Sequence, residues 1–191
     1  GAEHVAAASK IDHLAMFGGI IHDAGVGPVQ VLATPRLLLG RTGHVVARCL
    51  PPSDENDRRS RSVSRRHACI EWHGGYASIV DLRSASGTSV NGRSLAPGRE
   101  PFRLEHGDEI GLGPHVRFLF EHAPTTAGAL PPWARLTRID RHGAGITHVL
   151  VLTEATVACA PDAAIVAPPE ASAATLTLRA RGGQIVALRD E

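Results

Sequence analysis

The sequence predicts an all-β protein, a sandwich of short antiparallel strands, from three observations. Short apolar or alternating runs recur along the chain, each bounded by Gly, Pro, Asp or Asn, which is typical of strands. The pair Gly74-Gly75 stands between two such runs, where a tight hairpin turn requires positive φ. Helical periodicity is weak, and the only expected helical turn lies near residues 6–9.

The elements follow in chain order. The runs most typical of strands are 37–39, 68–72, 77–82 and 116–120. Asn91-Gly92 predicts a second tight turn, because both residues tolerate the left-handed conformation. The charged, proline-headed run 51–61 lacks periodicity, and we expect it to form an exposed loop.

Composition narrows the function classes. The chain has 191 residues and a formal charge of +1, whereas a general nucleic-acid binder would carry a strong basic excess. Its apolar runs fall short of the roughly 20 residues that cross a bilayer, and it lacks a signal-peptide pattern. We therefore expect a cytoplasmic protein without direct membrane insertion. The opening Gly1-Ala2, in place of methionine, suggests an excised fragment.

Cysteine and histidine usage argues against a metal site. Cys49, Cys69 and Cys159 are odd in number and widely spaced, so we expect buried thiols in a reducing compartment. The 11 histidines are scattered without ligand spacing. The sequence therefore predicts neither a metal nor a cofactor.

Composition also divides the chain. Residues 123–132 contain Pro124 and end in Pro131-Pro132, which is typical of a linker. The predicted organisation is an N-terminal extension at 1–11, a first domain at 12–122, this linker, and a smaller β-rich segment at 133–191.

Four motif blocks fall in the first domain in a fixed order. They are Gly40-Arg41, Ser64-Arg65-Arg66-His67, the run from Asp81 to Gly92, and the run from Leu104 to Gly113. In this order, with strand-like runs between them, they resemble a forkhead-associated (FHA) domain. The resemblance implies an FHA-type β-sandwich that binds phosphothreonine peptides and needs no cofactor.

The resemblance also implies a site. A phosphothreonine carries nearly two negative charges and three acceptor oxygens, so it needs fixed cations and well-aimed donors. Arg41, Ser64 and Arg65 match the family positions that supply them. The resemblance gives a supporting role to Gly40, His67, Gly87, Thr88, Asn91 and Gly92.

The third block departs from the family pattern Asp-Leu-Gly-Ser-Thr-Asn-Gly-Thr. Ala85 replaces a threonine whose hydroxyl reaches the phosphate, and Ser86 replaces an asparagine that holds the peptide backbone. A hydrogen bond to a charged group is worth roughly 1.5–3 kcal/mol, so Ala85 could weaken binding about ten- to a hundredfold. Arg83 replaces the glycine; we hypothesise that it reaches the phosphate, and a solvated surface arginine is the alternative.

The C-terminal segment resembles part of the first domain. Residues 31–34 align with 150–153, Gly74-Gly75 aligns with Gly182-Gly183, and 174–179 with 184–188 predict a second hairpin. We expect a degenerate, partial FHA-like repeat without a phosphate site; an unrelated β appendage is the alternative. Half a sandwich exposes strand edges, so we expect this segment to pack against the first domain or another chain.

These features predict a bacterial signalling or assembly module that binds a threonine-phosphorylated protein or peptide, and not nucleic acid. The alternative is a phospho-independent FHA scaffold that binds partners or self-associates through the sandwich face or the C-terminal segment. An enzyme is the weakest reading, because pairs such as His106 with Asp108 lack a nucleophile and an orienting group.

Overall fold

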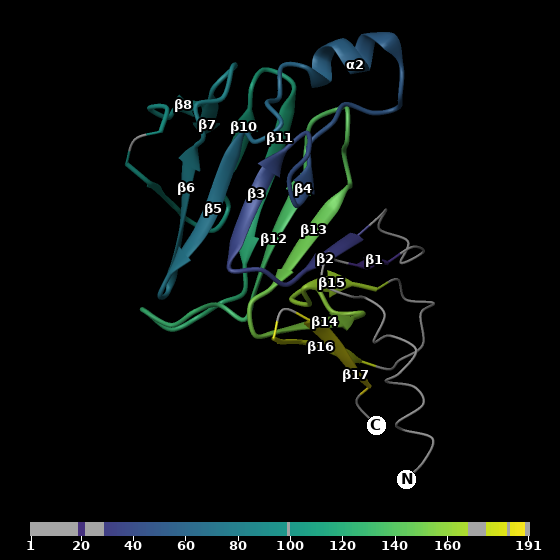
Figure 1. Ribbon diagram of the computed structural model, residues 1–191. Helices are drawn as coiled ribbons and strands as arrows, with labels where there is room; N and C mark the ends of the chain where they lie inside the picture. Colours follow the sequence, from purple (N-terminus) through teal and green to yellow (C-terminus); the bar gives the residue numbers. More distant parts are fainter. Residues whose placement is uncertain (1–18, 22–28, 99, 168–174, 183, 190–191) are drawn as a thin grey trace.

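The computed structural model describes residues 19–21, 29–98, 100–167, 175–182 and 184–189, and within them every regular element is a strand except for one short helix (Figure 1). This confirms the predicted all-β class. The helix expected near residues 6–9 lies outside the described residues.

The described strands form three sheets. Sheet A has the spatial order β1 (Gly19–Ile21), β2 (Val29–Leu32), β13 (Thr147–Val151), β12 (Trp133–Arg138), β11 (Val116–His122), β10 (Glu109–Leu112), β7 (Thr88–Val90) and β8 (Arg93–Ser94). Sheet B has the order β4 (Val45–Val46), β3 (Arg36–Gly40), β5 (Ala68–His73), β6 (Tyr76–Asp81) and β9 (Phe102–Leu104). Sheet C has the order β15 (Ile165–Val166), β14 (Glu154–Ala158), β16 (Leu176–Arg181) and β17 (Gln184–Arg189).

Sheet A is the shared middle layer. Sheet B covers one of its faces, and the core between them includes Leu39, Ile79, Phe118 and Phe120. Sheet C covers the other face at the β2–β13–β12 end (Figure 1). The strand β13 contributes to both cores, because its successive residues face opposite sides of the sheet and both sides are buried.

The linker does not separate the two predicted domains in space. The strands β12 and β13 follow residues 123–132, yet β12 pairs with β11 along Phe118↔Arg138 to His122↔Ala134. On the far side, β13 pairs in parallel with β2. The smaller segment therefore packs directly against the first domain, as its exposed edges led us to expect.

The two predicted turns have the expected backbone. Gly74 has φ 61° in the β5–β6 hairpin, while Asn91 and Gly92 have φ 50° and 77° between β7 and β8. The second hairpin, β16–β17, turns at Gly182 with φ 56°.

The run 51–61 was wrongly expected to be an irregular loop. It contains the helix α2 (Asp54–Ser60), whose N-cap Ser53 accepts a hydrogen bond from the amide of Asn56 at 3.1 Å. Acidic residues fill its first turn and arginines its last, which complements the helix dipole. The capping serine was the sequence signal for this helix, and seven residues are too few to show periodicity.

The expectation for the cysteines was wrong at one position. Cys49 and Cys69 are buried free thiols, whereas Cys159 is exposed. Cys159 follows β14 directly, in the loop before β15, where the chain leaves the sheet and its side chain meets solvent.

Candidate functional site

The first motif block lies where β3 ends against the loop that carries Ser64. A Cβ on Gly40 would lie 2.2 Å from the carbonyl oxygen of Arg65, and its φ is 157°. Only glycine permits this approach. The amides of Arg41 and Thr42 then donate to the carbonyls of Ser64 and Arg65, each at 3.1 Å, so the two loops form one unit.

The Arg41 side chain is oriented by one bond. Its Nε donates to the carbonyl of Val63 at 2.7 Å, and the residue is half-buried. Among the described residues, its two terminal nitrogens have no hydrogen-bond or ion-pair partner. The guanidinium is thus held in place with donors to spare, which is the arrangement that suits a bidentate anion.

Ser64 joins this unit to the loop after β6. Its Oγ accepts a hydrogen bond from the amide of Ala85 at 3.0 Å. A hydroxyl that accepts one bond keeps its hydrogen for a second bond, and no acceptor for it lies among the described residues. Ser64 therefore offers one fixed donor beside Arg41.

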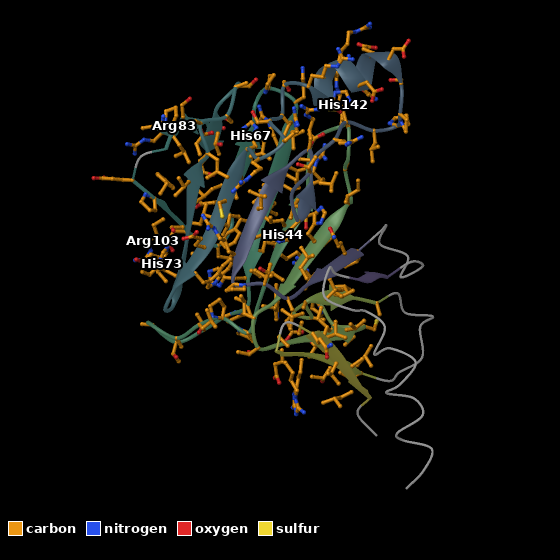
Figure 2. The ribbon with its side chains drawn as sticks, in the orientation of Figure 1. His44, His67, His73, Arg83, Arg103 and His142 are labelled. Carbon is orange, nitrogen blue, oxygen red and sulfur yellow. The ribbon has the colours of Figure 1, made fainter. Side chains whose placement is uncertain are left out.

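His67 holds the serine loop from below. It is fully buried; its Nδ1 accepts from the amide of Ser64 at 3.0 Å, so its hydrogen is on Nε2, which donates to the carbonyl of Gly87 at 2.9 Å. Burial lowers the pKa of His67, and the neutral ring required by these two bonds fits that shift. Figure 2 shows His67 inside the upper end of the domain, whereas Arg83 lies at its outer edge.

Asp81 organises the third block, a role that was not predicted from the sequence. It is buried and accepts hydrogen bonds from the amide of Ser84 at 2.9 Å and from the hydroxyls of Ser84 and Thr88, both at 2.6 Å. Burial alone would raise the pKa of Asp81, but these bonds outweigh it and the pKa is lowered. The signal was an aspartate that ends a strand, with hydroxyl residues three and seven positions later.

The departures from the family pattern lie on the exposed side of this loop. Ala85 and Ser86 are exposed. Ser86 lies close to Gly113: a Cβ added to Gly113 would lie 3.1 Å from the Cβ of Ser86. Arg83 adopts φ 59°, a left-handed conformation that glycine would take without cost.

The Arg83 side chain lies apart from Arg41 and Ser64. A Cβ on Gly98 would lie 3.0 Å from its Nε, so the arginine packs along the chain between β8 and β9. With Arg66 it lines an open surface depression of about 500 Å³ that neither Arg41 nor Ser64 borders. The structure therefore brings together Arg41, Ser64 and the backbone of Arg65, and places Arg83 with Arg66.

The remaining supporting residues brace the turn between β7 and β8. Asn91 donates through Nδ2 to Oδ1 of Asp108 at 2.8 Å, and its Oδ1 accepts from the amide of Glu109 at 2.9 Å. Gly87, with φ 78°, accepts from His67 and from the amide of Gly113. The contacts of Asn91 brace the β7–β8 turn, and those of Gly87 fix the C-terminal end of the loop 83–87.

The described part of the chain contains neither a cluster of metal-binding side chains nor a helix that could span a membrane. Its His, Cys, Asp and Glu residues nowhere gather in threes as a metal site would require. None of its helices has the length and apolarity to span a membrane.

Comparison with known proteins agrees with this geometry. Residues 38–113 match the family model of the FHA domain. No curated protein matches the chain.

Three solved structures illustrate the likeness. The FhaA FHA domain, solved in complex with an intracellular domain, is 32% identical over 41% of this chain and 71% of its own, with a TM-score of 0.31. A structure from work on phosphothreonine-dependent FHA domain interactions is 28% identical over 56% of this chain and 96% of its own, with a TM-score of 0.38. EmbR of Mycobacterium tuberculosis, in complex with a low-affinity phosphopeptide, is 26% identical over 65% of this chain and 31% of its own, with a TM-score of 0.37.

The matched residues run from β3 to the end of β10 and include every contact that joins Arg41, Ser64, His67 and Asp81. The chain therefore belongs to the FHA domain family, a class of β-sandwich interaction modules.

Proposed function

We propose that this chain is a phosphothreonine-dependent interaction module whose phosphate site is formed by Arg41, Ser64 and Arg65. The observation that carries the proposal is the pair of uncommitted donors at Arg41 and Ser64, each fixed by a bond that leaves hydrogens for an anion. Because these donors are already fixed, they lose little further conformational entropy when a phosphate binds.

The neighbouring residues divide the remaining work. Arg65 is exposed and its carbonyl is held by Thr42, so its side chain adds positive charge beside the phosphate. Ser86 is exposed on the adjacent loop and offers one hydroxyl to the peptide backbone. Arg83, which lies with Arg66, contacts the flank of the peptide, in place of the direct phosphate contact that the sequence suggested.

Two findings support this assignment beyond the geometry. The family match covers the four loops that form the site. The related EmbR was solved with a phosphopeptide, and its complex is described as low affinity. We expect weak binding here too, because Ala85 lacks the hydroxyl that its family position uses.

The test is a fluorescence-anisotropy titration of the whole chain with a degenerate phosphothreonine peptide pool and its unphosphorylated twin. We expect binding only to the phosphorylated pool, and a loss of about ten- to a hundredfold in the Arg41→Ala variant, the value of one or two charged hydrogen bonds. Arg181→Ala is the matched control, since Arg181 is exposed on the β16–β17 hairpin.

Two results would decide against the proposal. Equal binding of both pools would show that the phosphate is not read, and equal losses in both arginine variants would show only a general charge effect. Either result would favour the second candidate, an FHA scaffold without phosphate dependence, which the loss of hydroxyl at Ala85 favours. We assign no catalytic activity, because the site contains donors for an anion and lacks a paired base and nucleophile.

A further inference from the structure

Sheet C repeats the ladder of sheet B strand for strand. In sheet B the order is β4-β3-β5-β6, and in sheet C it is β15-β14-β16-β17. In both, the first pair is parallel and the next two pairs are antiparallel. The two ladders therefore share one topology.

The registers agree residue by residue. Leu39 pairs with Val45 and Ala68, and Val157 pairs with Ile165 and Leu176. The hairpins then match with a constant offset of 108, since Ala68↔Asp81 corresponds to Leu176↔Arg189 and His73↔Tyr76 to Arg181↔Gln184.

Side chains and loops agree as well. The cross-strand ion pair of Arg36 with Glu71 has its counterpart in Glu154 with Arg179, at the same register and with the charges exchanged. The bond from the amide of Ala47 to the carbonyl of Gly40, 2.9 Å, recurs from Ala167 to Ala158 at 2.9 Å. Independent β appendages would not share these details.

The ladders differ at one edge. In sheet B, β6 carries a further strand, β9, through Ala77↔Leu104, Ser78↔Arg103 and Ile79↔Phe102. In sheet C, β17 occupies the place of β6, and β16 is its only partner among the described strands. The offset places Ile185, Val186 and Ala187 where β6 receives β9.

The outer edge of β17 is suited to pairing with another strand. Residues 184–188 are uncharged, and none is proline, so the edge lacks the features that usually block strand addition. Ile185 and Ala187 are buried in the core shared with sheet A, which fixes the strand. Val186 and Leu188 are half-buried on the opposite face.

We propose that the outer edge of β17 binds an extended protein segment in the antiparallel register of β9, with apolar side chains at alternate positions around one polar residue. In sheet B the corresponding apolar residues are Phe102 and Leu104, and Arg103 is the residue between them. Backbone bonds supply affinity in such β-augmentation, and the alternate side chains supply specificity. This site is independent of the phosphate site.

The test uses the whole chain and a peptide with the sequence of residues 100–106, blocked at both ends, followed by amide NMR. We expect saturable shifts at residues 184–188 and no change near Ser64. Val186→Lys should weaken the peptide at least tenfold, because a lysine on an edge strand disfavours pairing. Thr156→Lys, on the same sheet but on the inner strand β14, is the matched control and should bind like the parent chain.

The outcomes are decisive in either direction. Amide shift changes in Val186→Lys that are confined to the neighbours of residue 186 would show that the fold is intact and that lost binding reflects the edge. Shifts absent at β17, or equal binding by a peptide with serine in place of Phe102 and Leu104, would overturn the proposal. Dimerisation of the chain without peptide, abolished by Val186→Lys, would assign the edge to a second copy and also overturn it.

Discussion

Arg83 is one of two non-glycine residues with positive φ in the described chain; Asn91 is the other. Asparagine adopts this conformation readily, whereas for arginine it costs roughly 1–2 kcal/mol. Backbone strain at an exposed residue beside a binding loop is a reason to look for function. Arg83 lines an open surface depression together with Arg66.

A glycine at position 83 separates strain from recognition. We expect Arg83→Gly to raise the free energy of unfolding by up to about 1 kcal/mol, because the relief of strain exceeds the added chain entropy. If Arg83 contacts the peptide, the same variant loses phosphopeptide affinity. Urea unfolding and the anisotropy titration measure the two effects. Unchanged affinity would make Arg83 a solvated surface residue.

At the scale of elements, a buried ion pair at the β12–β13 turn helps to anchor this hairpin, because each partner also hydrogen-bonds to the backbone of the first domain. Arg138, at the end of β12, pairs with Asp140 at 2.7 Å, and their side chains are 1% and 8% exposed. Its Nη1 also donates to the carbonyl of Arg48 at 2.9 Å, in the loop before α2. Burial tends to raise the pKa of Asp140, but its bonds to Arg138 and neighbouring amides outweigh it and lower the pKa.

We expect Arg138→Ala to lower the free energy of unfolding by about 3–5 kcal/mol, because it leaves Asp140 buried without its partner. Arg117→Ala removes an exposed pair with Glu109, whose side chains are 58% and 39% exposed, and should cost no more than about 1 kcal/mol. Chemical denaturation of both variants provides the comparison. Similar losses would mean that Arg138 does not lock the hairpin.

At the scale of the whole molecule, the second segment contributes to the core of the first. His148 lies on β13 but faces the core between sheets A and B. There its ring packs edge-on against Phe118, with the ring centroids 6.1 Å apart. Its Nδ1 bonds to Oε1 of Gln30 at 2.7 Å. Burial, with a smaller contribution from Arg138, lowers the pKa of His148 to about 4.

This shift predicts acid sensitivity of the whole fold. An unfolded histidine titrates near pH 6.5, so between about pH 6.5 and 4 the unfolded chain binds a proton that folded His148 refuses. Stability is therefore complete above this window and falls as the pH drops through it, by about 3 kcal/mol from this residue.

His67 acts in the same direction, so the comparison must be between variants. We expect His148→Gln to lose less stability than the parent chain between pH 7 and pH 4.5, as measured by urea denaturation. Equal losses in both proteins would show that other groups cause the acid sensitivity.

Much of the fold was predictable because strand periodicity and turn chemistry are local. Short apolar or alternating runs identified β3, β5, β6 and β11, and the glycine and asparagine pairs predicted the turns of the β5–β6 and β7–β8 hairpins. The helix α2 was missed because seven residues cannot show periodicity. Which sheet covers each face of a strand is not a local property, and the sequence left this open for β13, which is buried on both faces.

The candidate site divides in the same way. The order of the motif blocks in the sequence was enough to select Arg41, Ser64 and His67, because each block matches a family pattern. Only the folded chain showed that Asp81 braces the third loop and that Arg83 lies with Arg66. Those facts depend on which hydroxyls reach a buried carboxylate and on the φ angle of one residue.

The sequence by itself determined the all-β class, the main hairpins and the family, since these follow from alternation, turn residues and ordered motifs. The tertiary structure alone decided that sheet A serves two cores and that β12 and β13 lie between β11 and β2. Strand order across a sheet depends on long-range pairing, which alternation cannot specify. The same pairing leaves β17 as the edge where we place a second binding site.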